Sequence, residues 1–470
     1  MSISSVLFIF IFLPVCVLAY VFLPRLVRPV FLLLASLVFY AWGNPAYLIV
    51  LAISVVFNYF TGLEMQAAID AERDRDARIA LLIGVIFNVA VLGFFKYYGF
   101  VIGSLNSLFH AQLPIRDLPL PIGISFFTFS VLSYLIDVYR QDVPAQRNFI
   151  DFSVYVAFFA KVTSGPIVRY KDMAPQMDGH RPKLNDIGTG TAMFIRGLGK
   201  KVLLADSFGM MHSAIAALDA SQTHVLTAWL GCLAFTLQIY FDFGGYSDMA
   251  IGVGKMFGFE ITKNFDYPYI SKSLTEFWRR WHMTLGTWFR DYVYIPLGGN
   301  RAGLVRHMRN IMIVWLLTGI WHGAAWTFIL WGVYYGLLLL LEKYVLKGLL
   351  ERLPAPLVHI YTMFFVMIGW VFFAAPTVGS AFATLGQMFG VGTAGFAGMT
   401  TWYYLKTNLI RLIIGCVMST PVFYRQYKRF AFAKAPARSY ISVAIYVCVF
   451  VCSLAYLINA TYQSFLYVQF

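Results

Sequence analysis

Long uninterrupted hydrophobic runs dominate this chain, and polar residues gather in the shorter segments between them. The pattern predicts a first membrane span that ends near Leu23, a second that ends at Trp42 and a third that ends near Leu63. A helix of about 20 apolar residues crosses a bilayer. Continuous runs are typical of such helices, whereas strands of a membrane barrel alternate between apolar and polar positions. We therefore expect an all-α polytopic membrane protein with roughly 10–12 transmembrane helices or half-helices.

The later apolar runs extend this pattern towards the end of the chain. They predict further spans at 79–98, 119–136, 224–241, 357–374, 403–420 and 440–467. The run 151–161 is short for a crossing, and the turn-forming residues 163–166 (TSGP) after it are typical of unwound backbone. Residues 188–205 mix apolar and basic positions, which predicts an amphipathic helix in the membrane interface.

Composition agrees with a membrane protein and limits its partners. The chain is 60% hydrophobic and only 12% charged, whereas soluble domains carry about 25% charged residues. The formal net charge of +14 is explained by Lys and Arg in cytoplasmic loops. With no soluble domain expected to carry a basic face, we do not expect nucleic-acid binding. The five cysteines lack metal-binding spacing, so no metal site is expected.

Basic residues also predict the orientation of the first spans. Arg25 and Arg28 follow the first span, and Arg73, Arg75 and Arg78 follow the third, so both groups fall on the same side. Because Lys and Arg mark cytoplasmic loops, we expect the amino terminus to lie outside the cell membrane.

The segment 255–309 is both basic and aromatic. It predicts short helices at, or dipping into, the cytoplasmic face of the membrane. Helical spacing places Glu276 one turn from Arg280, and Trp278 one turn from His282. Arg279 and Arg280 are suited to an anionic ligand such as a nucleotide phosphate. The alternative is an aromatic and basic belt that anchors the helix to anionic lipid.

His322 lies in the segment 310–341, which contains no Asp, Glu, Lys or Arg. A titratable ring at membrane depth is costly to desolvate and is by default a functional candidate. It is suited to catalysis or proton transfer, or it fills a polar slot between helices. The segment exceeds one span and contains glycines, so we expect two elements with His322 near their junction.

Two carboxylates flank the pair Gly244-Gly245. The glycines predict a break in the helix after the preceding span. Asp242 follows an apolar run directly, and Asp248 lies six positions later. They are suited to orienting a histidine or lining a polar cavity, and the simpler interpretation is a salt-bridged turn.

Several motifs, in their order along the chain, resemble one family. They are PIGISFFTFSVLSYLIDVYR (121–140), SGPIVRY (164–170), FDFGGYSDMAIG (241–252), NFDYPYISKSLTEFWRRWHMTLGTWFRDYVYIPLGGNR (264–301) and WHG (321–323). Together they resemble the membrane-bound O-acyltransferases, and most closely the bacterial branch that O-acetylates alginate and other exported polysaccharides. The sequence departs from that branch at Gly244, where Ser is common, and at Lys161, where Pro is expected.

The resemblance implies a fold and a site. It implies a single domain over 1–470, with a motif-rich core at about 119–345 and C-terminal helices at about 357–470, in a ring of tilted helices around a funnel and tunnel. His322 is then the catalytic histidine and His282 the second histidine. The residues expected to bind the donor or line the tunnel are Asp242, Asn264, Trp278, Arg279, Arg280 and Trp321.

The resemblance also implies an activity. It is transfer of acetyl groups from a cytoplasmic donor, acetyl-CoA or an acyl carrier, across the bilayer for O-acetylation of an exported polysaccharide. No permanently bound cofactor is expected. The implied partner is a separate periplasmic acetyltransferase of the SGNH, esterase-like kind, and the implied location is the bacterial inner membrane with a periplasmic amino terminus. The alternatives are a glycan transporter or flippase in which His322 relays protons, and D-alanyl transfer to teichoic acid.

Overall fold

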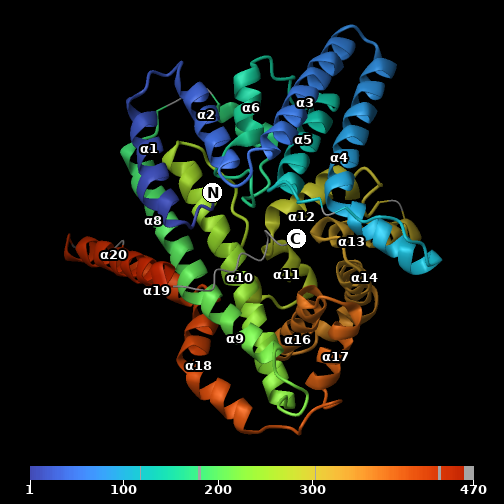
Figure 1. Ribbon diagram of the computed structural model, residues 1–470, viewed down its shortest axis with the longest axis vertical. Coiled ribbons are helices and arrows are strands. Elements are labelled where there is room, and N and C mark those ends of the chain that lie inside the picture. Colours follow the sequence, from blue (N-terminus) through green and yellow to red (C-terminus); the bar gives the residue numbers. More distant parts are fainter. Residues whose placement is uncertain (117, 178–180, 302, 432–435, 460–470) are drawn as a thin grey trace. The chain divides into compact units, whose positions relative to one another are not determined.

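The computed structural model describes residues 1–116, 118–177, 181–301, 303–431 and 436–459, and the regular structure within them is helical (Figure 1). The chain divides into two compact units. Unit 1 comprises residues 1–194 and 247–263, and unit 2 comprises 195–246 and 264–470. We describe each unit by itself, and the single domain over 1–470 stays a prediction.

Six helices in the described part of the chain are long and apolar enough to cross a membrane. They are α3 (Tyr47–Asp70), α4 (Asp74–Phe109), α10 (Val225–Met256), the segment Trp326–Leu350, α16 (Ala355–Ala374) and the segment Tyr440–Asn459. Three shorter apolar helical segments are Phe8–Phe22, Arg28–Ala41 and Ile124–Tyr139. The all-α polytopic class is therefore confirmed. Residues 460–467 of the last expected span lie outside the described residues.

Unit 1 is built mainly from the amino-terminal helices. These are η1 (Phe8–Phe12), α1 (Leu13–Phe22), α2 (Arg28–Ala41), α3, α4, α5 (Ile124–Tyr139), α6 (Phe149–Ala157), α7 (Tyr170–Met173) and η2 (Ala174–Gln176). Helices α3 and α4 lie side by side (Figure 1). Asn58 and Asn88 join them by reciprocal amide hydrogen bonds of 3.2 and 2.6 Å. Such polar pairs hold apolar helices together in lipid, where burial of apolar surface drives little association.

The expected unwinding after the short run 151–161 is present. Helix α6 ends at Ala157, and the chain turns through 158–165 without regular helix. Gly123 allows this turn to approach α5, because it has a φ of +75° and a Cβ there would lie 1.9 Å from the Val162 carbonyl oxygen. Only glycine fits a position that combines left-handed backbone with so close an approach.

Unit 2 contains most of the remaining elements. In addition to parts of α8 (Leu184–Gly199) and α10, they are η3 (Lys200–Ala205), α9 (Asp206–Ala216), η4 (Pro268–Ile270), α11 (Leu274–Arg280), α12 (Met283–Phe289), η5 (Arg290–Tyr294), α13 (Leu304–His322), α14 (Trp326–Leu341), η6 (Glu342–Leu346), α15 (Lys347–Leu350), α16, α17 (Val378–Met388), α18 (Met399–Met418), α19 (Val422–Ala431) and α20 (Pro436–Asn459). The segment 264–294 forms short helices, as the sequence predicts.

The predicted break at Gly244-Gly245 is wrong, because α10 continues to Met256. Gly245, and Gly252 further along the helix, serve helix packing instead. A Cβ on Gly245 would lie 2.7 Å from the Gly197 carbonyl oxygen, and one on Gly252 would lie 2.6 Å from the Gly190 carbonyl oxygen. Small residues let two helix backbones approach closely in a membrane protein.

The prediction of an interfacial amphipathic helix over 188–205 is wrong at its end. The chain passes without interruption from α8 through the π-helical η3 into α9. Lys201 is only 4% exposed in η3. Its ammonium group forms a buried ion pair with a carboxylate on α10, whereas an interfacial helix would present it to water.

Helices α13 and α14 form a closely packed hairpin in unit 2. A Cβ on Gly319 would lie 2.3 Å from the Phe328 carbonyl oxygen, and one on Gly332 would lie 2.4 Å from the Trp315 carbonyl oxygen. The hairpin breaks between His322 and Trp326, so the expected junction near His322 is confirmed.

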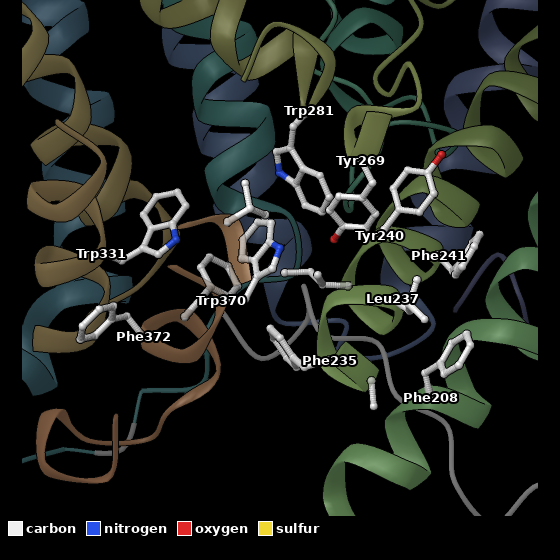
Figure 2. Close-up of a cluster of buried hydrophobic side chains, with 14 of the residues drawn as sticks. Phe208, Phe235, Leu237, Tyr240, Phe241, Tyr269, Trp281, Trp331, Trp370 and Phe372 are labelled. Carbon is white, nitrogen blue, oxygen red and sulfur yellow. The ribbon is translucent and has the colours of Figure 1, made fainter. Parts of the chain in front are cut away.

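Aromatic side chains fill the core of unit 2 around this hairpin. Figure 2 shows Tyr269, Trp281, Trp331 and Trp370 directed into one buried cluster. They come from separate elements, namely η4, the segment between α11 and α12, α14 and α16. Some residues of this cluster, such as Trp331, also pack against the candidate site.

Candidate active site

His322 is the last residue of α13, where the helix gives way to extended backbone. Gly323 has φ of −174° and ψ of 160°. A Cβ on Gly323 would lie 2.3 Å from the Phe328 ring, so glycine lets α14 pack directly beside the histidine. His322 itself is 4% exposed.

Aromatic rings surround the His322 imidazole. The ring centroids of Trp331 and Phe373 both lie 5.1 Å from it, at interplanar angles of 82° and 78°. Trp321 lies 5.0 Å away, also edge to face. These contacts fix the plane of the imidazole and surround it with apolar surface. Hydrogen bonds and interactions between charges are stronger in such low-dielectric surroundings than in water.

His282 has unusual backbone geometry. It lies between α11 and α12 with φ of +44° and ψ of +54°, in the left-handed region. Histidine is enriched there relative to most residues, but the conformation still costs on the order of 1–3 kcal/mol and persists only where the surroundings enforce it. The predicted one-turn relation between Trp278 and His282 is wrong, because α11 ends at Arg280 before His282 is reached.

Asn264 fixes the protonation of the His282 ring. The Asn264 side-chain oxygen accepts hydrogen bonds from His282 Nδ1 at 3.1 Å, from the Thr284 amide at 3.2 Å and from Thr284 Oγ1 at 2.9 Å. Three converging donors identify this atom as the amide oxygen, which can only accept. The His282 proton is therefore on Nδ1, and Nε2 presents a lone pair.

Burial keeps this histidine neutral. His282 is 2% exposed, and desolvation lowers its pKa from 6.5 to about 3. Phe243 packs edge to face against the ring at 4.7 Å, and Phe265 stacks against it at 6.4 Å. A neutral imidazole with one lone pair is a hydrogen-bond acceptor at physiological pH.

The Trp321 indole connects the two histidines. Its ring centroid lies 5.8 Å from that of His282 and 5.0 Å from that of His322. Both imidazoles therefore contact the same indole in unit 2, although they are 40 positions apart in the sequence.

Asp242 is fully buried on α10 and pairs with a lysine. Its carboxylate accepts a 2.7 Å hydrogen bond from Lys201 Nζ, and the Asp206 carboxylate lies 3.8 Å from the same ammonium group. The next residue, Phe243, packs on His282. Asp242 thus anchors α10 to η3 next to the residue that packs on His282, which differs from the salt-bridged turn considered from sequence.

The two arginines of the expected anion site have different surroundings. Arg280 pairs with Glu276 at 2.9 Å, as helical spacing predicts, and with Asp266 at 3.3 Å. Arg279 is exposed. Trp278 faces the core instead, 4.7 Å from Tyr335 and 5.5 Å from Trp331. The structure brings Asn264, Trp278 and Trp321 together with the histidines, and ties Arg280 to neighbouring acids.

Comparison with known proteins places this geometry in a family. A sequence model of the membrane-bound O-acyltransferase family matches residues 139–384. The chain is 41% identical to the probable alginate O-acetylase AlgI of Azotobacter vinelandii over 91% of this chain and 86% of that protein. It is 42% identical to its Pseudomonas aeruginosa counterpart, over 89% and 79%. The chain belongs to the membrane-bound O-acyltransferase family.

Other relatives of this membrane-bound O-acyltransferase are named for different activities. The peptidoglycan O-acetyltransferase of Helicobacter pylori is 38% identical over 83% of this chain and 80% of its own length. A teichoic acid D-alanyltransferase of Streptococcus thermophilus is 31% identical, but over 46% of this chain and 55% of its own length. The family match at 139–384 contains both histidines, Asn264 and Trp321.

Sequence reasoning missed several residues that shape the site of this O-acyltransferase. Phe243, Thr284, Trp331 and Phe373 contact or position the histidines, and Lys201 holds Asp242. Thr284 could have been suspected, because it lies two positions after His282. The aromatic residues gave no signal, since Phe and Trp occur throughout the apolar runs of this chain.

Proposed function

We propose that the protein is a membrane O-acetyltransferase that takes acetyl groups from cytoplasmic acetyl-CoA and passes them across the membrane for O-acetylation of an exported polysaccharide such as alginate. The observation that carries the proposal is the pair of buried histidines around Trp321. Its support is the O-acetylase and O-acetyltransferase names of relatives that align over most of the chain.

In this proposal His322 is the general base. It takes the proton of an acceptor hydroxyl, whose oxygen forms a bond to the thioester carbonyl carbon. The carbon–sulfur bond then breaks, and the departing thiolate takes the proton back from the His322 imidazolium. The aromatic walls around His322 exclude water, which would otherwise compete as acceptor.

His282 has a different role in the same step. Because its Nδ1–H is donated to the Asn264 oxygen, its Nε2 lone pair accepts a hydrogen bond from an amide N–H of the acetyl-CoA arm and so positions the thioester. The same tautomer disfavours stabilisation of a developing negative charge by His282, since Nε2 carries no proton to donate.

The proposal extends to location and partners. The protein lies in the bacterial inner membrane with its amino terminus in the periplasm, so that Arg279 and neighbouring basic residues face cytoplasmic acetyl-CoA. The nucleotide phosphates of this donor match that positive charge. A separate periplasmic esterase-like acetyltransferase completes the transfer to the polysaccharide.

The test is radiolabelled acetyl transfer in sealed vesicles. Labelled acetyl-CoA is supplied on the cytoplasmic side to wild type and to His322→Ala, with the inserted amount of each measured. We expect the variant to lose about 10²- to 10⁴-fold in rate, the usual contribution of a general base, while its insertion is unchanged. Full acetyl transfer by well-inserted His322→Ala would contradict the proposal.

The same vesicles separate the alternatives. A glycan transporter would move labelled glycan without any acetyl transfer from acetyl-CoA. A D-alanyltransferase would use a D-alanyl carrier protein and leave acetyl-CoA untouched. The alignment with a D-alanyltransferase covers less of this chain than the alignments with the O-acetylases, so it gives less support to D-alanyl transfer than they give to O-acetylation.

A further inference from the structure

Trp278, Trp331 and Trp370 of the aromatic cluster in unit 2 each have a buried indole N–H without an acceptor among the described residues, and Trp331 is the one of these three whose ring contacts His322. Trp331 on α14 is 0% exposed, and Trp278 on α11 is partly buried. Within the part of the chain that the structure describes, Nε1 of each ring is buried without a hydrogen-bond acceptor. Buried tryptophans usually find an acceptor for this group.

Trp229, also in unit 2, shows that this chain can satisfy an indole. Trp229 donates its Nε1 proton to the Met388 carbonyl oxygen at 2.9 Å. Leaving a buried donor unsatisfied destabilises the folded protein by the desolvation of that group. Unsatisfied donors on two rings in contact, Trp278 and Trp331, therefore point to a ligand that supplies the acceptor.

The two indoles are placed against the reacting histidine and against each other. Trp331 lies 5.1 Å from the His322 imidazole, nearly perpendicular to it. Trp278 lies 5.5 Å from Trp331 at 86°. Figure 2 shows the Trp331 indole at one end of the cluster, with its nitrogen on the side that faces Trp370.

We propose that Trp331 donates its Nε1–H to the carbonyl oxygen of the acyl group during transfer, with the Trp278 Nε1–H as a second donor. The inference rests on the proposed function. When the hydroxyl oxygen bonds to the carbonyl carbon, the carbonyl π pair moves onto oxygen, and the indole protons stabilise that oxyanion. When the carbon–sulfur bond breaks, the pair returns to re-form the carbonyl. Neither indole gives up its proton.

The chemistry of the indole suits this role. It donates and does not accept, so it cannot compete with His322 for the hydroxyl proton. It is also uncharged, so it is buried in an apolar site without the desolvation cost of an ion. Fixed donors aimed at developing charge in a water-poor site are a major source of rate enhancement. The Trp331 indole thus donates to the oxyanion, which His282 cannot do because its Nε2 carries no proton.

The experiment replaces Trp331 by β-(3-benzothienyl)alanine, which keeps the bicyclic shape and exchanges the N–H for sulfur. Acetyl transfer from acetyl-CoA is measured in vesicles at varied donor concentration. We expect kcat to fall about a hundredfold, the effect of removing one oxyanion donor, with KM for acetyl-CoA changed little. Trp331→Phe should fall at least as far. The same replacement at Trp229 is the matched control, since it removes an N–H whose bond is purely structural.

Each outcome decides the inference. A full kcat in the Trp331 replacement overturns it, as does an equal loss at Trp331 and Trp229, which would indicate a general effect of losing an indole N–H. If wild-type vesicles transfer acetyl groups and only the Trp331 result fails, the proposed function stands and this inference falls. If wild type transfers no acetyl group under any condition, both fall together.

Discussion

The two histidines of the site are held in place by different physical means. His282 lies in strained left-handed backbone and is fixed by hydrogen bonds, through Asn264 and Thr284. His322 ends a regular helix and is fixed by packing, through aromatic rings and the glycines of the α13–α14 hairpin. Polar anchoring sets which nitrogen carries a proton, whereas packing sets the plane of a ring and excludes water.

This difference suits the two roles that we propose for the histidines. A hydrogen-bond acceptor must keep one tautomer, so a polar partner at Nδ1 is needed. A general base must take up and release a proton, and rigid aromatic walls hold the plane of its ring while it does so. We therefore expect different effects from loss of the buried ion pair on α10, from overpacking of the hairpin beside His322, and from a change in the hydrogen-bond partner of His282.

The largest expected effect is on the polar side, at Lys201→Met. This change leaves the Asp242 and Asp206 carboxylates buried without their shared ammonium group. Removing one partner of a buried ion pair costs about 3–5 kcal/mol of folding free energy. We expect strongly reduced thermal stability in detergent, measured by loss of monodisperse protein on heating.

Two further variants sharpen that prediction. Lys347→Met removes a largely exposed pair with Glu351 and should change stability little. Lys201→Met combined with Asp242→Leu should recover part of the loss, because one of the uncompensated carboxylates is gone. Equal stability of wild type and Lys201→Met would show that the ion pair does not anchor α10.

The second prediction concerns packing, at Gly319→Ala. The new Cβ would lie 2.3 Å from the Phe328 carbonyl oxygen and 3.3 Å from the Gly332 Cα, so the helices of the hairpin must separate. Overpacking typically costs about 1–3 kcal/mol. His322 lies less than one turn away, so we also expect the acetyl-transfer rate to fall more than tenfold in the fraction that remains folded.

The matched control is Gly93→Ala, which is also within a long helix but has nothing within 4 Å of its new Cβ. It should be neutral or slightly stabilising, because alanine favours helix over glycine by about 1 kcal/mol. Retention of full stability by Gly319→Ala would mean that the hairpin tolerates a wider spacing than its glycines indicate.

The same contrast explains what the sequence could predict. The hairpin break beside His322 followed from the length of an apolar run and its glycines, and the Glu276–Arg280 pair followed from helical spacing. Both depend on residues close together in the chain. The all-helical class likewise followed from local composition.

The missed features depend on distant partners. Left-handed backbone at His282 is enforced by Asn264, 18 positions earlier, so helical spacing from Trp278 misplaced the ring. Gly244-Gly245 looked like a helix break because a glycine that ends a helix and one that admits another backbone have the same local pattern. Lys201 looked interfacial because its counter-ion lies 41 positions away, on α10.

The smallest expected effect comes from Asn264→Asp, which keeps the shape and the acceptor and adds a negative charge. In wild type, burial holds the His282 pKa at about 3, so this ring stays neutral from pH 8 down to pH 5. A carboxylate at Nδ1 favours the imidazolium and raises that pKa. As pH falls, the variant therefore protonates Nε2, loses the acceptor lone pair and loses activity in a range where wild-type His282 does not titrate.

The measurement is the ratio of variant to wild-type kcat at each pH, which cancels every pH effect that the two proteins share. We expect this ratio to be highest near pH 8 and to fall by up to about tenfold towards pH 5.5. The neutral fraction of His282 in the variant falls about tenfold for each pH unit below its raised pKa. Asn264→Ala serves as the control, because it removes the acceptor without adding charge, and its ratio should be low but independent of pH. A flat ratio for Asn264→Asp would mean that the buried carboxyl takes up the proton itself, and that polar anchoring sets the position of His282 without controlling its charge.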